Sequence, residues 1–174
     1  MNLFYAPSFT AEDKSVALSQ EESKHATKVL RKKNGDHIHL TNGKGLIAEG
    51  KIQNTLGKTV QVSLIDIKEQ KPKSYTLDLY VAPTKMNDRY EWFLEKATEI
   101  GLSSVTPILC DQSERKVIKA ERYEKVLLSA MKQSLQAYLP VLHPAISLKK
   151  CLDQDITVGQ VFAHSEAITP KTAL

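Results

Sequence analysis

The sequence predicts an α+β protein of two parts, a small β-barrel at residues 1–70 and an α/β domain at residues 75–174. Short apolar runs that alternate with polar residues and turn signals fill the first part. A polar segment with one proline, residues 71–74, interrupts this pattern and is predicted to be the linker. After it, apolar strands alternate with segments of helical periodicity, which is typical of a mainly parallel sheet covered by helices.

The elements of the first part are predicted from alternation and turn residues. Strands are expected at residues 38–40, 48–52 and 59–67. Asn42-Gly43 is a strong hairpin signal between the first two strands. One helix interrupts them, since Ser19 and Glu22 form a capping-box pattern ahead of it and Asn34-Gly35 ends it. Several short strands around one helix favour a small barrel.

The second part is predicted to begin with a strand, a helix and another strand. The apolar run at residues 77–81 indicates a strand buried on both faces. Asn87 or Asp88 is expected to cap the next helix, and Gly101 to end it in a left-handed cap. The apolar stripe of that helix consists of Tyr90, Phe93, Leu94, Ala97 and Ile100. In the buried strand that follows, Pro107 favours a position at an edge or an end.

Three further elements complete the predicted sheet domain: a long helix at residues 120–138, a short helix at 148–152 and a strand at 158–163. Ligands of open parallel sheets bind beyond the carboxyl ends of the strands. The sequence offers three such strand ends, at residues 83–85, 110–115 and 164–166.

Composition excludes several classes of protein. No run of about eighteen apolar residues occurs, so no membrane span is expected, and the N-terminus lacks the pattern of a secretory signal. Cys110 and Cys151 match neither metal-ligand nor redox spacing, so no metal is expected and both thiols are expected to be reduced. These features are typical of a cytoplasmic protein.

The net charge of +4 is confined to the first part of the chain. Residues 1–74 hold twelve Lys and Arg against eight Asp and Glu, whereas residues 75–174 hold twelve of each. The basic cluster, as we call it, consists of Lys24, Lys28, Arg31, Lys32 and Lys33. Such a cluster suits a phosphate backbone, and the alternative is a solvated helix face.

Three blocks of the sequence resemble one known family. The first consists of His25, Val29-Leu30-Arg31 and Gly35-Asp36. The second consists of Lys85, Arg89, the run from Glu95 to Gly101, Thr106-Pro107 and Ser113-Glu114-Arg115. The third consists of Ala130-Met131-Lys132-Gln133-Ser134 and Leu139-Pro140. In these blocks, which follow the family order, the chain resembles the bacterial 16S rRNA uridine-N3 methyltransferases, the small-subunit methyltransferase E type of the SPOUT superfamily.

The chain departs from the family pattern in two respects. Lys132 stands where the family usually has Glu, and Gln136 stands where it usually has Arg. The family's G-P-E-G-G loop and L-R-x-E-T-A helix start, which tie a knot and bind S-adenosylmethionine, do not occur in these 174 residues. We therefore expect a shortened form of such an enzyme, which stops before the donor-binding knot.

The resemblance implies a PUA-like RNA-binding β-barrel followed by a partial, Rossmann-like SPOUT domain. It implies S-adenosylmethionine-dependent methylation of N3 of a specific uridine in 16S rRNA within the small ribosomal subunit. S-adenosylmethionine is expected in the full-length enzyme, whereas this chain alone is expected to bind none and to be inactive. The family forms homodimers through the knot, so the resemblance leaves a homodimer of this chain in doubt.

The resemblance also implies two groups of site residues. The RNA-binding group consists of Lys24, His25, Lys28, Arg31, Lys32, Lys85, Arg89, Arg115 and Gln136. The group near the methyl donor consists of His164, Ser165 and Glu166. No residue is identified as the catalytic base. The alternative roles are structural: ion pairs along their helix for Lys85 and Arg89, a loop cap for Arg115, and an ordinary strand-end position for His164.

Two other classes of protein compete with the enzyme. One is a non-catalytic RNA-binding module, made of a PUA-like barrel and an incomplete α/β partner. The reading frame downstream of residue 174 discriminates between them, because only the enzyme requires the two donor-binding motifs. The other is a metabolic α/β enzyme with a β appendage, which is disfavoured since the sequence contains no cofactor motif.

Overall fold

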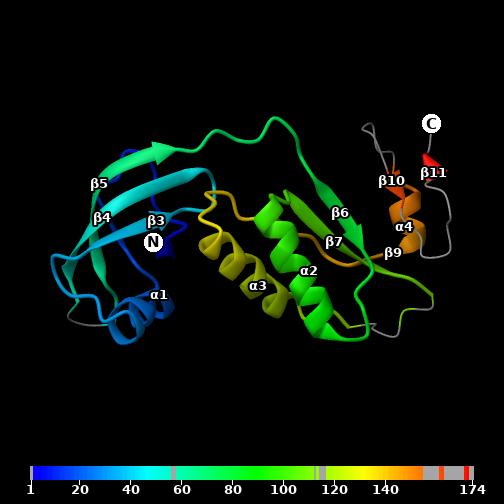
Figure 1. Ribbon diagram of the computed structural model, residues 1–174, viewed down its shortest axis with the longest axis horizontal. Coiled ribbons are helices and arrows are strands. Elements are labelled where there is room, and N and C mark those ends of the chain that lie inside the picture. Colours follow the sequence, from blue (N-terminus) through cyan, green and yellow to red (C-terminus); the bar gives the residue numbers. More distant parts are fainter. Residues whose placement is uncertain are drawn as a thin grey trace.

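The computed structural model describes residues 2–55, 58–111, 113 and 117–154, and the backbone of two short strands beyond them (Figure 1). The N-terminal part consists of β1 (Leu3–Tyr5), β2 (Ser15–Ala17), α1 (Gln20–Lys24), the π-helix η1 (His25–Val29), β3 (His37–Thr41), β4 (Leu46–Asn54) and β5 (Gln61–Glu69). The C-terminal part consists of β6 (Asp78–Val81), α2 (Asn87–Ile100), β7 (Ser104–Leu109), α3 (Ala120–Gln133), β8 (Val141–Leu142), β9 (Ile146–Ser147) and α4 (Leu148–Leu152). The two short strands, β10 (Val161–Phe162) and β11 (Lys171–Thr172), pair antiparallel.

The strands of the N-terminal part form one curled sheet in the order β1-β3-β4-β5-β2 (Figure 1). The β1–β3 pairing is parallel, and the other three pairings are antiparallel. The β4–β5 register shifts between Glu49 and Gly50 and again between Ile52 and Asn54. Such irregularities bend and twist a strand pair. Among the described residues β1 and β2 do not pair with each other, so the expected barrel is present as an open, curled sheet.

The core of the N-terminal part is built from apolar residues of all five strands, of η1 and of the loops between them. It consists of Phe4, Ala6, Phe9, Val16, Leu18, Ala26, Ile38, Leu40, Ala48, Ile52, Val60 and Val62. The alternation predicted along β4 and β5 is confirmed where Ile52 and Val62 are buried while their neighbours Lys51 and Gln61 are exposed.

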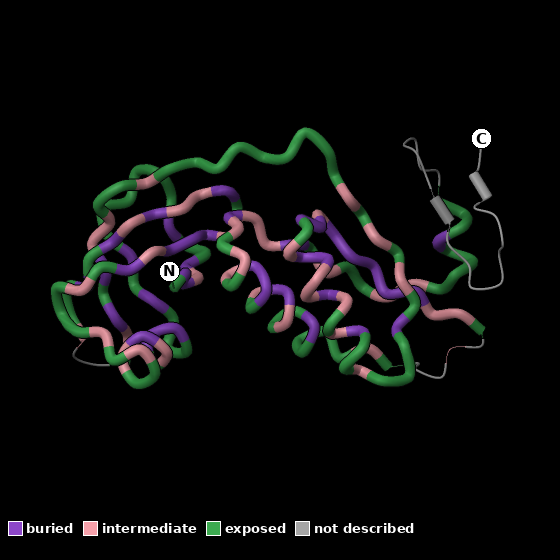
Figure 2. Tube along the Cα trace, in the orientation of Figure 1, coloured by how far each residue is buried: buried purple, intermediate pink, exposed green. Residues whose placement is uncertain are grey.

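The C-terminal part is a parallel sheet with β7 at its centre. β6 pairs with one edge of β7, and β8 and β9 pair with the other. The helices α2 and α3 lie side by side (Figure 1), and their apolar faces join the sheet in one core. Its buried members are Tyr90, Leu94, Ala97, Leu102, Val105, Tyr123 and Leu127. β7 is buried along nearly its whole length (Figure 2), as a central parallel strand should be.

Two strand predictions are wrong in this sheet. Pro107 lies at neither an edge of the sheet nor an end of its strand, since β7 is central and runs from Ser104 to Leu109. β8 ends opposite Val105, and β9 begins opposite Ile108. Pro107, which has no backbone N–H group, therefore lies opposite the gap between β8 and β9. The strand at residues 77–81 is not buried on both faces, since β6 alternates between exposed and half-buried residues as an edge strand.

The ends of the two long helices also differ in part from prediction. Neither Asn87 nor Asp88 caps α2, because the helix already includes both and Met86 occupies the N-cap position without a side-chain bond. Gly101 ends α2 with a φ of 108°, so the predicted left-handed cap is confirmed. α3 ends five residues earlier than predicted, since the chain turns away through Leu135, whose φ is 57°.

The segment after α3 joins the two parts of the molecule. Gly45 N–H donates to the carbonyl of Ala137 at 3.0 Å, and Leu139 N–H donates to the carbonyl of Gly43 at 2.9 Å. The turn between β3 and β4 therefore pairs with a segment nearly a hundred residues further along the chain. Gly43 and Gly45, which the sequence marks only as turn residues, hold the two parts together.

Other expected features are settled only in part. The short helix at residues 148–152 is confirmed as α4. Gly57 and most of the strand predicted at residues 158–163 lie outside the described residues. In the described part of the chain no helix has both the length and the apolar character to cross a membrane. Within those same residues, no three His, Cys, Asp or Glu side chains gather as a metal site would require.

Candidate nucleic-acid interface

The basic cluster lies on the helical segment α1–η1 and on the turn that follows it. Its exposed members are Lys24, Lys28, Arg31 and Lys33. Lys32 is half-buried, and its ammonium donates to the carbonyl of His37 at 3.3 Å. The structure thus presents four cations to solvent on one continuous stretch of chain, which is what phosphate binding requires.

The backbone beneath the basic cluster is irregular. In η1, Leu30 N–H donates to the carbonyl of His25 at 3.0 Å, five residues back. Arg31 adopts a left-handed φ of 53°, and Lys32 N–H then reaches the carbonyl of Ala26 at 2.9 Å. Both π-helical turns and left-handed residues other than glycine cost stability, and they concentrate at functional sites. The sequence pattern gave no signal for either feature.

A groove of about 350 Å³ lies between α1 and α3, so both parts of the molecule form it. Its lining consists of Tyr5, Ser19, Glu21, Glu22, His25, Lys125, Leu128, Ser129 and Lys132. His25, which the sequence places among the RNA-binding residues, is half-buried here, with its ring centroid 5.7 Å from that of Phe4. Burial raises the pKa of the Tyr5 phenol above its ordinary value, so this ring stays neutral at physiological pH.

An ion pair crosses this groove. The ammonium of Lys132 lies 2.6 Å from Glu22 Oε1, and the side chains are 21% and 8% exposed. The predicted capping box is therefore only half formed. Ser19 Oγ accepts from Glu22 N–H at 3.2 Å, as expected, but the Glu22 carboxylate extends across to α3. Sequence reasoning missed this pair because its members are 110 positions apart.

Lys85 and Arg89 follow the carboxyl end of β6, and both are exposed. For Arg89, one structural alternative is an ion pair along α2. The acids of that helix instead pair with Arg122 and with Lys96, and none of the ion pairs formed among the described residues includes Arg89. Arg89 is thus available to a ligand at this edge of the sheet.

The other two strand ends are less complete. After β7, Cys110 N–H donates to Ser113 Oγ and Ser113 N–H donates to the Cys110 carbonyl, both at 2.9 Å, so the chain turns tightly there. Arg115 lies outside the described residues, and so does the group consisting of His164, Ser165 and Glu166. Their predicted roles stay predictions.

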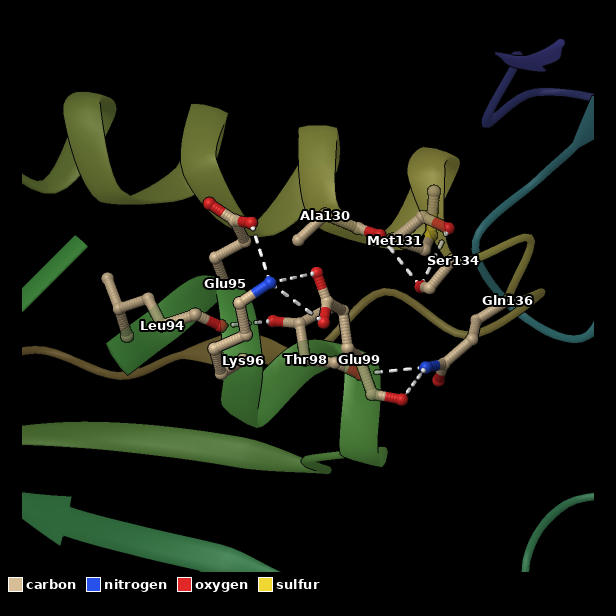
Figure 3. Close-up of polar contacts among 9 residues, drawn as sticks. All are labelled: Leu94, Glu95, Lys96, Thr98, Glu99, Ala130, Met131, Ser134 and Gln136. Atoms are coloured by element: carbon tan, nitrogen blue, oxygen red, sulfur yellow. Dashed lines mark hydrogen bonds and ion pairs between the residues drawn. The ribbon is translucent and has the colours of Figure 1, made fainter. Parts of the chain in front are cut away.

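Gln136 has a structural role that the sequence did not suggest. Its amide nitrogen donates to the carbonyls of Thr98 and Glu99 at 2.7 and 2.9 Å, in the last turn of α2 (Figure 3). The Thr98 carbonyl also accepts from Gly101 N–H at 3.0 Å. The Lys73 ammonium donates to the next carbonyl, that of Ile100, at 2.7 Å. Because its amide nitrogen is used in this way, only the side-chain oxygen of Gln136 remains for the RNA contact that was predicted.

Comparison with known proteins identifies the class to which this architecture belongs. Residues 18–65 match the family model described as the RNA methyltransferase PUA domain, and residues 71–173 match that of the RNA methyltransferase domain. The chain therefore belongs to the RNA methyltransferase family, with a PUA-like domain followed by a methyltransferase domain.

Individual relatives agree with this assignment. The chain is 30% identical over 158 residues to the ribosomal RNA small subunit methyltransferase E of Rickettsia conorii, covering 88% of this chain and 63% of the relative. A probable rRNA methyltransferase from Porphyromonas gingivalis is 39% identical with a TM-score of 0.77, over 88% of this chain and 64% of that one. The chain thus spans less than two thirds of the length of these relatives.

A third relative contains the methyl donor. The structure of ribosomal RNA small subunit methyltransferase E from Neisseria gonorrhoeae bound to S-adenosyl methionine matches with a TM-score of 0.77. The match covers 90% of this chain and 66% of that one, at 24% identity, which establishes a common fold.

Proposed function

We propose that this chain is the RNA-binding and substrate-positioning portion of an S-adenosylmethionine-dependent enzyme that methylates N3 of a uridine in 16S rRNA. Its substrate would be the small ribosomal subunit, in the cytoplasm. The observation that carries the proposal is the exposed basic cluster on α1 and η1 of a PUA-like domain, in a chain of the RNA methyltransferase family. We further propose that the domains extend over residues 1–70 and 75–174, with the linker at 71–74.

The proposed contacts fall into two groups. Lys24, Lys28, Arg31 and Lys32 would bind phosphates through charge, which gives affinity without sequence preference. Arg89 and Lys85, beyond the carboxyl end of β6, would orient the target nucleotide, where parallel sheets present functional side chains. We propose the same orienting role for Arg115.

The chemistry of uridine N3 explains why positioning matters. N3 carries a proton at neutral pH, so methyl transfer requires its loss and a cation that stabilises the resulting imide anion. S-adenosylmethionine supplies an already reactive methyl group when it is bound. Arg89 and Arg115 would provide positive charge near the target base, and the base that takes the proton is not identified. The residues expected near the donor lie outside the described part of the chain.

Salt dependence of RNA binding tests the proposal. We expect this chain to bind a fluorescein-labelled U-rich single strand with an affinity that falls as salt rises. The triple variant Lys28→Ala, Arg31→Ala, Lys32→Ala should lower the slope of log affinity against log salt by about two units, because each lost phosphate contact removes about 0.7. Fluorescence anisotropy between 50 and 300 mM salt measures this slope.

The control removes the same charge elsewhere in the PUA-like domain and its linker. Lys14, Lys58 and Lys71 are exposed and lie outside the basic cluster, so their combined replacement by alanine should leave the slope nearly unchanged. Equal slopes for the two triple variants would show that the cluster is only a solvated helix face.

A further inference from the structure

The groove between α1 and α3 contains a buried acceptor that the fold does not use. Glu22 is 6% exposed, and its Oε1 is paired with Lys132. Its second oxygen, Oε2, is fully buried and has no hydrogen-bond partner among the described residues. Leaving a buried charged oxygen unpaired costs about 1–3 kcal/mol or more. In a complete capping box the Glu22 carboxylate would accept from the backbone N–H of Ser19. The carboxylate instead extends to Lys132, so this local partner is not used.

The missing partner of Glu22 must be a neutral donor. An ionised carboxylate only accepts hydrogen bonds. The ammonium of Lys132 already compensates its charge, so a second cation would leave a net positive charge in a buried place. If the carboxylate turns so that Oε2 faces the groove, a ligand that offers N–H groups without a charge of its own satisfies this oxygen without that cost.

The other walls of the groove contain side chains that suit a nucleobase. His25 and Tyr5 are half-buried rings that line it from η1 and β1. Such rings provide stacking surfaces for unstacked bases. Lys125, exposed on α3, lines the same groove and suits the phosphate attached to a bound base. The groove volume of about 350 Å³ lies within the range of small-molecule sites.

The edge of the base can be specified further. A carboxylate is best matched by two adjacent N–H donors with no acceptor between them. Guanine offers that pair on its Watson–Crick edge, at N1 and N2. Adenine and cytosine offer one amino group beside an acceptor nitrogen, and uracil offers N3–H between two carbonyl oxygens that a carboxylate repels. The groove therefore favours guanine.

We propose that the groove between α1 and α3 binds one unstacked guanine of the RNA substrate, with Glu22 accepting hydrogen bonds from its Watson–Crick edge. The site deepens the proposed function and rests on it, since it presumes an RNA substrate. It also assigns a role to Lys132, which holds the Glu22 carboxylate in position from the opposite wall.

Binding of matched hexanucleotides to the complete chain tests this site. The labelled probes are UUUUUU, UUGUUU and UUIUUU, in which inosine lacks the N2 amino group. We expect the single guanine to strengthen binding about 5- to 100-fold over uridine, and inosine to give an intermediate gain. In Glu22→Gln the guanine gain should disappear, so the ratio of the affinities for UUGUUU and UUUUUU should fall to about one.

Two further variants make the result specific. Glu124→Gln removes the same charge from an exposed position on α3 that does not line this groove, so the guanine gain should persist. Ser129→Trp fills the groove from an exposed position and leaves Glu22 in place, so it should abolish the gain even if Glu22→Gln proves unstable. Circular dichroism melts establish that each variant is folded.

The outcomes separate this inference from the proposed function. Salt-dependent binding of UUUUUU without a guanine gain, or a gain that survives both Glu22→Gln and Ser129→Trp, overturns the guanine site and leaves the proposed function standing. No binding of any probe overturns both.

Discussion

Arg31 would combine two opposing demands in one residue, the stability of the fold and the RNA binding that we propose. Its left-handed φ of 53° costs about 1–2 kcal/mol in a residue with a side chain. Arg31 follows the π-helix and is exposed, as a member of the basic cluster. A strained residue at an exposed basic position is readily explained if the side chain binds a ligand.

Replacing Arg31 by glycine separates these two demands. Glycine adopts the left-handed conformation without strain, although it also gains freedom in the unfolded chain, so Arg31→Gly should stabilise the fold by up to about 1 kcal/mol. A gain of that size raises Tm by roughly 2–4 °C. The salt slope for single-stranded RNA should meanwhile fall by about 0.7. Thermal melts and anisotropy titrations measure the two effects.

Lys28 provides the matched control for this substitution. It lies within η1 and is exposed, so Lys28→Ala removes the same charge from a helical backbone. The salt slope should fall equally, but Tm should not rise. A lower Tm for Arg31→Gly would contradict this prediction. It would show that the arginine side chain stabilises the turn by more than its left-handed backbone destabilises it.

At the scale of elements, local signals predicted α2 well and its neighbours less well. As predicted, the stripe of Tyr90, Leu94 and Ala97 is buried and Gly101 ends the helix. Both features could be predicted because the first depends on local periodicity and the second on one backbone angle. Ile100 was counted in the stripe but is 69% exposed, since it lies in the last turn where the helix leaves the core. The central position of Pro107 was missed because it depends on where two other strands end.

The C-terminus of α2 is stabilised by distant side chains, and Gln136→Ala tests this. The variant removes the side-chain donor to the Glu99 carbonyl and one of the two donors to the Thr98 carbonyl, so we expect a loss of about 1–2 kcal/mol in unfolding free energy. Tm should fall by roughly 2–8 °C. RNA affinity should change little, because Lys73 still contacts the next carbonyl and the helix end persists.

Gln133 is the control for this helix end, because it is exposed in the last turn of α3 and its replacement by alanine should not alter Tm. A normal Tm for Gln136→Ala together with weakened RNA binding would reverse the assignment. In that case Gln136 would contact RNA, as the family resemblance suggested.

At the scale of the whole molecule, the sequence predicted two parts but not how they are joined. Thr41, Gly43 and Gly45 bond to the segment after α3 across a separation of nearly a hundred residues. The side chain of Tyr138 then lies against Gly45 and donates to the carbonyl of Gln70 at 2.9 Å. Nothing in a local pattern specifies such partners. The same applies to the groove between α1 and α3, whose two walls come from the two parts of the molecule.

This junction leads us to expect that the two parts unfold together, and Gly45→Ala tests the coupling. A β-carbon at Gly45 would lie 2.6 Å from Tyr138 Oη, so the ring must move and its bond to Gln70 must break.

Gly35→Ala is the control, because Gly35 has a similar φ of 93° but its β-carbon would meet only Lys51 Cε at 3.8 Å. Both variants bear backbone strain of about 1–3 kcal/mol. Only Gly45→Ala should lose further stability, and hydrogen exchange should then accelerate both in residues 41–45 and in residues 137–139, since one set of bonds protects both segments. Equal losses of stability in the two variants, with exchange faster in only one segment, would show that the parts unfold independently and that Tyr138 packs on Gly45 without coupling them.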